Sequence, residues 1–499
     1  MKDDLRGVFH RLGSRHVHGL VAVPLLLMAA MFAGCGGGGG FGPVFSGNTT
    51  IDLLATSTAN DQLVQFPLTL KNMTLTSLTG TTVTLFSTPV SAEFIHLNGS
   101  LEPLATVSVP QGIYTAASAV FDGAAPVCVG LDPSSREILI DGALNGPGTP
   151  TVTVNLPQPI VVTGAGMGLV LNLVVSKSAP FSGGCVKNLS VPIAPVFNLT
   201  PLPGIATRPT NISNGKIVGL VGVVASTAVA GNQFTQFALS VPGGYWNANP
   251  PTLQVSTNGG TVYQGIVNGG DLVTGMPVEI DVALQVDGTL MATRVAVYNT
   301  DATNLSLSLG QLLMPGIGQS TVDGLTTQMV GDLTSMYDEF GYGSASFSVS
   351  SQFTNLQNLP FAANFSATNQ VPGQNVLITS NASLVNGFPP SPFPATTMTL
   401  MPQTIDGTVS AVSTSGGFNI YTVTLAAYNL FPNLASENPR PLTPLTNPNT
   451  VVVYADSNTQ MLNTNPVAVG SVVRFYGLVF NDNGTLRMDC AEINDGVPE

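Results

Sequence analysis

The chain has 499 residues, a formal net charge of −13 and only 8% charged residues, whereas a typical soluble domain has about 25%. The scarcity of Lys and Glu disfavours long helices, and the abundance of Val, Thr, Gly and Asn favours strands joined by turns. This length predicts roughly three or four domains. We therefore predict an all-β protein built from several small cores.

The first 40 residues differ from the rest of the chain. Basic residues precede an apolar run over 20–33, which ends at Gly34 and Cys35 and is followed by glycines at 36–40. The run is shorter than the roughly 17–25 residues of a membrane-spanning helix and is typical of a signal peptide. The alternative is a buried helix, which Pro24 and the glycine tract disfavour. The basic residues are Lys2, Arg6, Arg11 and Arg15.

Small residues directly before a cysteine, behind a basic leader and a short apolar run, resemble the signal of bacterial lipoproteins. The resemblance implies cleavage between Gly34 and Cys35 and a diacylglycerol on the Cys35 thiol. Residues 1–34 are then a signal peptide, and 35–48 are a lipidated, Gly-rich tether. The resemblance also implies export and a membrane partner, for which we expect the outer membrane, with the protein periplasmic or surface-exposed.

From 49 to 200 the pattern is one of short strands separated by turn residues at spacings of about 8–12 residues, which is typical of a β-sandwich. We therefore predict a β-sandwich domain over 49–200. The predicted strands are 68–75, 83–86, 94–97, 105–109, 113–121, 151–156, 160–163 and 168–175.

Two stretches of this domain, 104–121 (LATVSVPQGIYTAASAVF) and 169–176 (LVLNLVVS), resemble an uncharacterised domain family of bacterial lipoproteins. The resemblance implies a transthyretin- or immunoglobulin-like fold, in which a Pro-x-Gly-x-Tyr turn introduces a central strand. Pro110, Gly112 and Tyr114 match that turn. The family often ends the late strand with acidic residues, whereas Asn172 stands here, and the family has no established activity.

Few residues suited to catalysis or metal binding follow the leader. With Cys35 lipidated, Cys128 and Cys185 lie in one exported domain, and we predict a disulfide between them. Cys490 alternates with apolar residues and is interpreted as an inert thiol in a core. His96 is the single histidine after the leader, so a multi-histidine zinc site is excluded, and we interpret it as structural rather than catalytic. We predict no metal and no cofactor.

Prolines are frequent over 179–215, and we predict that this segment is extended and semi-rigid, with 201–215 as the linker between domains. After it, one motif recurs at nearly equal intervals, and glycines that open each unit precede it at Gly222, Gly324 and Gly407. The motif is Gly275-x-x-Val278-x-Ile280, Gly373-x-x-Val376-x-Ile378 and Gly470-x-x-Val473-x-Phe475.

Two of the units also carry a hairpin, at Asp287-Gly288 and Asn483-Gly484, where type I′ turns are expected because both central residues take positive φ. A calcium loop is the alternative, but it needs six to eight oxygens, and the spaced carboxylates of an EF-hand are missing. The glycine motif and hairpin resemble uncharacterised OB-like repeats that occur in tandem in exported bacterial proteins. The resemblance implies repeats over 216–300, 318–400 (degenerate) and 403–499, the last with a Pro-rich surface loop at 432–448.

OB barrels often bind single-stranded nucleic acid through a basic groove. From residue 216 to the end the chain has 5 basic and 17 acidic residues, a balance that repels phosphate and argues against nucleic acid as a partner.

Two further clusters are candidates for chemistry or binding. Asp332, Asp338 and Glu339 are the densest acids; a glycosidase needs two carboxyl groups across a cleft, whereas neighbouring acids in a Gly-rich segment indicate an exposed loop. Tyr245 and Trp246 are the best candidates for stacking on a sugar or contacting a protein, with plain packing as the alternative.

The sequence therefore predicts a lipid-anchored envelope protein with a non-catalytic binding, adhesion or structural role, and no enzymatic activity. The possible partners are a glycan or another protein. The alternatives are an envelope polysaccharide hydrolase, or a spacer subunit of a surface or export complex.

Overall fold

The computed structural model describes most of the chain between residues 45 and 496, and Ser46–Glu499 forms one unit, to which all that follows refers. The described ranges are 45–59, 63–95, 97–99, 101–124, 127–129, 137–139, 141–144, 151–180, 190–202, 216–230, 234–240, 252–285, 289–300, 306–315, 319–328, 332–341, 345–381, 393–425, 429, 431, 444–463 and 465–496. Their regular secondary structure is almost entirely β-strand, which confirms the all-β prediction.

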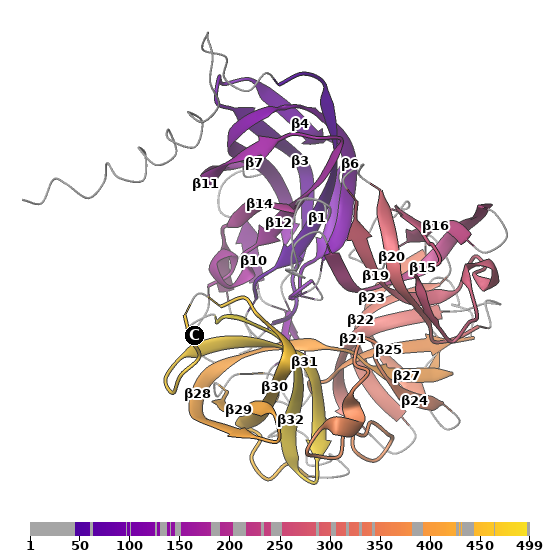
Figure 1. The fold of residues 1–499 in the computed structure, drawn as a ribbon. Coiled ribbons are helices and arrows are strands. Elements are labelled where there is room, and N and C mark those ends of the chain that lie inside the picture. The colour runs from indigo at the N-terminus through magenta and orange to yellow at the C-terminus, as the bar shows by residue number, and fades with distance from the viewer. Residues whose placement is uncertain are drawn as a thin grey trace, which may run out of the picture. The chain divides into compact units, whose positions relative to one another are not determined.

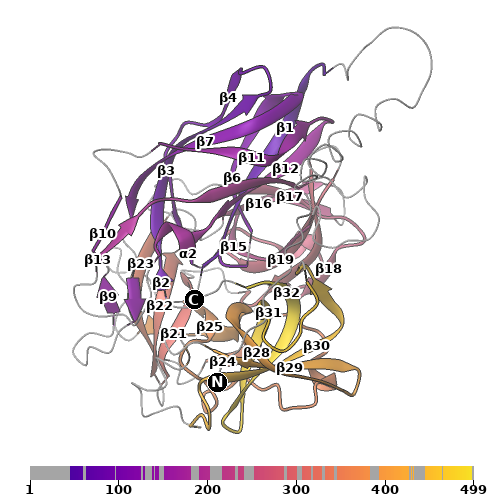
Figure 2. The same cartoon turned by 90° about the vertical axis from the view of Figure 1, so that its left-hand side faces the viewer.

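The N-terminal part contains two main sheets (indigo to magenta in Figures 1 and 2). One has the order β14-β12-β1-β6, and the other has the order β11-β7-β3-β4 with β5 paired to β3. Apolar side chains of both sheets belong to one core, in which Phe121 and Phe197 lie 6.0 Å apart between ring centroids. The strands are β1 (Asn48–Ser57), β3 (Pro67–Ser77), β4 (Thr82–Phe86), β5 (Val90–Glu93), β6 (Glu102–Pro110), β7 (Gly112–Ala124), β11 (Thr151–Val162), β12 (Gly166–Leu173) and β14 (Phe197–Leu202).

Short elements accompany these sheets. One group is the three-stranded sheet β2-β8-β9, the other is the pair β10-β13, and a single helical turn, α2, follows β12. Their bounds are β2 (Leu63–Gln65), β8 (Val127–Val129), β9 (Glu137–Leu139), β10 (Asp141–Leu144), β13 (Ser190–Ile193) and α2 (Val175–Ser178).

The predicted Pro-x-Gly-x-Tyr turn joins the two sheets. Only Gln111 separates β6 from β7, so the chain passes from one sheet to the other at this corner. The Tyr114 side chain is 2% exposed, and its hydroxyl donates to the Pro110 carbonyl at 2.8 Å. The turn leads into β7, which lies between β11 and β3, so the expected central strand is confirmed.

Two local predictions for this region are wrong. Residues 94–97 do not form a strand in their described part, because Phe94 and Ile95 lie in a bend after β5, although both are buried. Residues 190–202 are not a free extended segment, because they include β13 and β14. Pro201 is tolerated in β14 because that strand lies at the edge of its sheet, where fewer backbone donors are needed.

Three further strand systems follow. The first is a six-stranded sheet, β17-β16-β15-β19-β20-β18, in which β17 also pairs with β20, and the second is a seven-stranded sheet, β24-β27-β25-β21-β22-β23-β26. The third is a small closed barrel of five strands, β28-β29-β30-β32-β31 (orange to yellow in Figure 1).

The strands of the six-stranded sheet are β15 (Lys216–Ala230), β16 (Phe234–Ser240), β17 (Thr252–Ser256), β18 (Val262–Gln264), β19 (Pro277–Leu284) and β20 (Leu290–Val297). Those of the seven-stranded sheet are β21 (Ser306–Pro315), β22 (Gln319–Gln328), β23 (Asp332–Gly341), β24 (Ser346–Val349), β25 (Asn375–Ser380), β26 (Phe393–Pro394) and β27 (Thr397–Leu400). Those of the barrel are β28 (Gln403–Ser415), β29 (Phe418–Thr424), β30 (Thr450–Met461), β31 (Val472–Asp482) and β32 (Thr485–Asp495).

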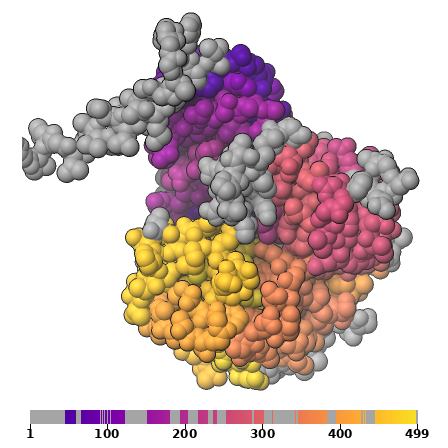
Figure 3. Space-filling model, viewed as in Figure 1, coloured from indigo at the N-terminus to yellow at the C-terminus, as the bar shows by residue number. Residues whose placement is uncertain are grey.

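The barrel and the segment before it share apolar contacts. Leu478 and Phe480 of β31 are fully buried in one cluster with Val376 and Met398 of the seven-stranded sheet. In the space-filling view the orange and yellow residues accordingly form one continuous surface (Figure 3).

The recurring glycine motif has one structural role in all three places. Gly275, Gly373 and Gly470 have φ of 95°, 96° and 87°, and each precedes a strand, β19, β25 or β31. Their backbone amides donate to the carbonyls of Val224, Leu312 and Val409 at 2.8, 2.7 and 2.8 Å. Glycine is required because other residues rarely adopt this left-handed conformation.

The hydrogen bonds of these three turns also identify the opening glycine of the middle segment, which is not the predicted one. Gly222 and Gly407 lie two residues before Val224 and Val409, and the residue two before Leu312 is Gly310, not the predicted Gly324. Gly324 lies opposite Gly310 in the β21–β22 ladder. The sheet that contains the middle motif therefore begins with β21, ahead of the predicted boundary at 318.

The predicted Asn-Gly hairpin is confirmed between β31 and β32. Asn483 and Gly484 have φ of 52° and 89°, as both central residues of a type I′ turn must. Asp287 and Gly288 lie outside the described residues.

Gly407 provides a test of this packing. A Cβ there would lie 2.5 Å from Val423 Cγ1 and 2.8 Å from the Thr424 carbonyl oxygen, at an otherwise ordinary φ. We expect Gly407→Ala to lower the free energy of unfolding by about 1–3 kcal/mol, as overpacking does, measured by urea denaturation. Gly112→Ala is the control, because its Cβ would make only an ordinary 3.7 Å contact with Tyr114. Equal effects of the two changes would contradict the close approach of β28 and β29.

Candidate functional site

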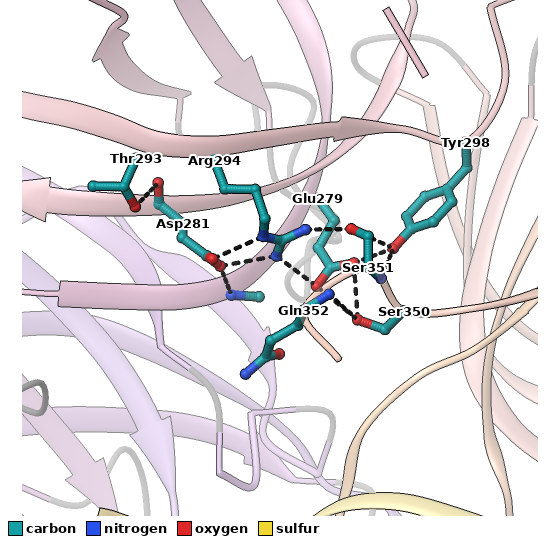
Figure 4. A network of polar contacts seen from close by, with 9 residues as sticks. Glu279, Asp281, Thr293, Arg294, Tyr298, Ser350, Ser351 and Gln352 are labelled. Atoms are coloured by element: carbon teal, nitrogen blue, oxygen red, sulfur yellow. Dashed lines mark hydrogen bonds and ion pairs between the residues drawn. The ribbon is translucent and has the colours of Figure 1, made fainter. Parts of the chain in front are cut away.

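A buried network of charged and polar side chains lies at the six-stranded sheet (Figure 4). Glu279 and Asp281 alternate along β19, and Arg294 lies opposite Asp281 on β20. The Arg294 guanidinium donates to both Asp281 oxygens, from Nε at 2.8 Å and from Nη2 at 2.9 Å. Nη2 also donates to Glu279 Oε1 at 2.9 Å. One arginine therefore binds two carboxylates, in a charge-assisted geometry that is stronger than neutral hydrogen bonding.

The rest of the network comes from Tyr298, directly after β20, and from the loop after β24. The Glu279 side chain is completely buried, and it accepts hydrogen bonds from the Ser350 hydroxyl, at 2.9 and 3.1 Å, and from the Tyr298 hydroxyl. Ser351 accepts a hydrogen bond from Arg294 Nη1, and its backbone amide donates to the Tyr298 oxygen at 3.0 Å. The network therefore joins β19 and β20 to residues 57 and 71 positions later in the chain.

The electrostatics of the network favour charge on Arg294 and a neutral Tyr298. Burial alone lowers the pKa of Arg294, but the hydrogen bonds and charges of Asp281 and Glu279 raise it above its usual value. Burial, with the negative charge of Glu279 in second place, raises the pKa of the Tyr298 hydroxyl. Tyr298 therefore stays a hydrogen-bond donor at all physiological pH values. Such an arrangement stabilises a fold and offers no free base or nucleophile.

A cavity of about 260 Å³ lies beside this network, and we call it the junction cavity. It shares Gln352 with the loop that bonds Glu279. Its other walls come from distant parts of the chain. They include residues 56–58 and Asn172 of the N-terminal sheets, Val218 of β15, and Arg474, Tyr476 and Glu492 of the barrel.

Arg474 is the main cationic group of the junction cavity. Its side chain is 9% exposed, Nη2 donates to the Ser57 carbonyl at 3.3 Å, and Nε lies 3.8 Å from Asp406 Oδ2. Nε makes no hydrogen bond, and neither does the buried Oε1 of Gln352. Both atoms are buried away from solvent, and Nε faces Asp406 Oδ2, which also makes no hydrogen bond.

The two other titratable groups of the cavity are held toward their neutral forms. Burial raises the pKa of Glu492, against the opposing effects of Arg474 and Asn494. Burial, followed by the charges of Glu279 and Glu492, raises the pKa of Tyr476. The cavity thus places an arginine, a tyrosine and a glutamate next to one another in a largely buried setting.

A close contact fixes the N-terminal wall of the cavity. Gly99 has a φ of 85°, and a Cβ there would lie 2.6 Å from Thr404 Oγ1 and 3.0 Å from Tyr476 Cδ2. The Thr404 hydroxyl donates to the Asn98 carbonyl at 2.9 Å. The loop at 98–99 therefore packs directly on the barrel.

Most residues singled out from the sequence lie outside the described part of the chain. These are Gly34, Cys35, His96, Cys185, Tyr245 and Trp246. Cys128 lies in β8, opposite Leu63 and Ile138, but its side chain is not described, so the Cys128–Cys185 disulfide stays a prediction.

The remaining candidates are placed by the structure. Asp332, Asp338 and Glu339 belong to strand β23, so the prediction of a loop is wrong, and their side chains lie outside the described part. Asn172 lines the junction cavity, where its amide bonds the Thr58 hydroxyl at 3.0 Å. Cys490 is 4% exposed in the barrel core, and burial raises the pKa of its thiol, so a buried, unreactive cysteine is confirmed.

Sequence reasoning missed the charged residues that form the network and the cavity. A signal was present for the network, because Glu279 and Asp281 interrupt an otherwise apolar strand, PVEIDVAL, in a chain that uses few charges. Such residues are almost never buried unless they are paired. No comparable signal marks Gln352 or Ser350, whose roles depend on contacts with distant strands.

No known protein-family profile matches this sequence, and no curated protein matches it. Within the described ranges, no helix has the length and apolar character needed to cross a bilayer. The same ranges contain no group of three or more His, Cys, Asp or Glu side chains placed to hold a metal ion.

Removing the cation of the network tests its contribution to stability. Arg294→Met leaves the buried Glu279 charge without its guanidinium, and we expect a loss of about 3–5 kcal/mol in the free energy of unfolding. Lys71→Met is the matched control, because the Lys71–Asp122 pair is 40% and 45% exposed, and such pairs contribute about 0–1 kcal/mol. Denaturant titration of both variants makes the comparison; similar small losses would contradict the role of the network.

A second prediction concerns pH. Burial, followed by the charge of Asp456, raises the pKa of Asp489 from 3.8 to about 7. Between these values the folded state binds more protons than the unfolded state, so this group makes the protein less stable as pH rises from about 4 to 7.

We therefore expect Asp489→Asn to raise the thermal midpoint at pH 8 and to have little effect at pH 4. Thermal unfolding across this pH range is the measurement, with the exposed Asp495→Asn as control. A pH-independent effect of Asp489→Asn would contradict the shifted pKa.

Proposed function

We propose that this protein is a non-catalytic, lipid-anchored component of the bacterial envelope, whose β-domains form a rigid scaffold that carries a binding site. The observation that supports this most is the Glu279–Arg294 network. Both carboxylates and the guanidinium are occupied by partners from the chain itself, whereas catalysis requires groups that are free to react with a substrate.

The scaffold would consist of an immunoglobulin- or transthyretin-like sandwich followed by three OB-like units. The strand pairings support three related units. The short strands β18 and β24 are left out of this comparison, so that each unit has five strands. In each unit the first strand (β15, β21 or β28) pairs with the second and with the fourth (β19, β25 or β31). The third strand pairs in parallel with the fifth. The parallel pairs are β17–β20, β23–β26 and β30–β32, with β26 directly preceding β27 as part of the fifth strand in the middle unit.

A further likeness supports common descent of these units. The first strand of each has a register shift directly after the residue that accepts the glycine hydrogen bond, at Val224, Leu312 and Val409. Such a bulge bends a strand and increases its twist, as closure of a small barrel requires. The position four residues after the glycine is buried in all three units but differs in chemistry, as Glu279, Leu377 and Arg474.

The membrane attachment is proposed from the leader alone. Two acyl chains on Cys35 would anchor the protein stably, since one chain gives only marginal binding. The Gly-rich tether would let the scaffold stand away from the bilayer surface. A glycan or another envelope protein is the expected partner.

The lipid anchor is tested by expression in a bacterium fed with a labelled fatty acid. Cys35→Ser should abolish labelling, leave the leader uncleaved and change the mass of the product accordingly. Gly40→Ser, which leaves the cysteine intact, is the control and should be labelled like the unchanged protein. An unlabelled wild-type protein with an intact leader would refute the proposal.

A further inference from the structure

We propose that one end of the N-terminal sandwich rests on the lipid bilayer and places a row of apolar side chains in the headgroup region. Four segments form this end, which we call the sandwich tip. The inference rests on the proposed lipid anchor and adds a second, non-covalent contact with the same membrane. The segments of the tip are 46–50, 77–82, 110–113 and 161–165.

Hydrogen bonds join three segments of the tip around the corner between β6 and β7. The Gln111 amide donates to the Gly47 carbonyl at 3.0 Å, and the Gln111 side chain donates to the Gly164 carbonyl at 3.2 Å. The Thr49 hydroxyl donates to the same Gly164 carbonyl at 2.7 Å. The start of β1, the corner and the turn after β11 therefore form one connected surface.

An apolar row crosses the outer face of the tip. Val161 of β11 lies directly opposite Ile113 of β7, so their side chains share one face of the sheet. On the other side of Ile113, Leu78 donates its amide to the Ile113 carbonyl at 2.9 Å, which joins the fourth segment to the tip. Leu78 is 68% exposed and Val161 is 48% exposed, whereas the adjacent Val162 is fully buried. Moving the two exposed side chains out of water is favourable.

The tip and the sequence that leads to it carry no charge. Residues 36–51 and the other three segments contain no acidic, basic or histidine residue, although the whole chain has a net charge of −13. The nearest charges in β3 and β7 are Lys71 and Asp122, which pair with each other. They lie seven residues before Leu78 and nine after Ile113, which is about 20–30 Å at ~3.3 Å per residue. Anionic lipids are therefore not repelled at the tip.

The place of the tip in the chain selects a bilayer as its occupant. Ten residues, 36–45, separate Cys35 from the tip, and they span at most about 35 Å when fully extended, at ~3.3–3.6 Å per residue. A lipid on Cys35 would keep the tip within this distance of the membrane and so raise the effective concentration of bilayer at the tip. The tether would equally allow the sandwich to stand away, so contact depends on the apolar row.

The test uses the whole chain from Cys35 onward, joined through its amino-terminal cysteine to a thioester of a two-chain lipid. The anchored protein is placed in vesicles of phosphatidylethanolamine and phosphatidylglycerol that contain a brominated phosphatidylcholine as a contact quencher. Leu78→Trp is made together with Trp246→Phe, which removes the single natural tryptophan. We expect the brominated lipid to lower its fluorescence at least twofold and the emission to shift to shorter wavelength.

Two matched variants connect the signal to the tip. Thr153→Trp, in the same background, lies at an exposed position of β11 eight residues before Val161, which is about 25 Å at ~3.3 Å per residue, and should not be quenched. Val161→Asp, added to Leu78→Trp, should restore most of the fluorescence because a carboxylate is costly to remove from water. Thr153→Asp, added instead, should leave the quenching unchanged.

Quenching of Leu78→Trp that Val161→Asp removes supports the proposal. Equal quenching of Leu78→Trp and Thr153→Trp, or quenching of neither, overturns it. Self-association of the unlipidated chain that Val161→Asp abolishes also overturns it, because a second copy would then cover the row. The lipid is attached chemically here, whereas labelling of Cys35 is measured in the bacterium, so failure of the contact and failure of the natural anchor can be told apart.

Discussion

The structure depends most on the buried charge of Glu279. Moving a carboxylate out of water costs several kcal/mol even after the protein relaxes, and Glu279 is completely buried. Arg294 supplies the opposite charge from the neighbouring strand, but the remaining lone pairs are satisfied by Tyr298 and Ser350. Because Ser350 belongs to the loop after β24, the charge can be buried only when that loop lies against β19. A local electrostatic requirement thereby holds two distant segments together.

The network and the junction cavity are connected through few residues. Gly219 donates its amide to Asp281 at 2.8 Å and has a φ of 69°, and a Cβ there would lie 2.9 Å from Gln352 Oε1. The same Gln352 oxygen is buried and makes no hydrogen bond. Tyr476 lies near enough to both features for its pKa to respond to Glu279 and to Glu492. Gln352 therefore packs between the network and the cavity, with its side-chain oxygen buried.

The three glycine turns show how one backbone arrangement carries different side chains. The turn, its hydrogen bond and the following strand are alike at Gly275, Gly373 and Gly470. Of the residues four positions later, Glu279 belongs to the network, Leu377 to an apolar cluster, and Arg474 to the cavity. The backbone geometry of the turn is thus the same in the three strand systems, whereas the side chain four positions later is acidic, apolar or basic.

The sequence by itself determined the features that depend on neighbouring residues. Strand periodicity, the Asn483-Gly484 turn, the corner at Tyr114 and the burial of Cys490 were predictable because backbone preference and alternation act within a few positions. Only the tertiary structure decided that Phe94 and Ile95 form a bend, that 190–202 join the sheets and that Gly310 rather than Gly324 opens the middle sheet. The network and the cavity were also beyond local reasoning, since Glu279 bonds Ser350, and Gln352 lines a cavity with Arg474, across stretches of chain whose pairing no short pattern encodes.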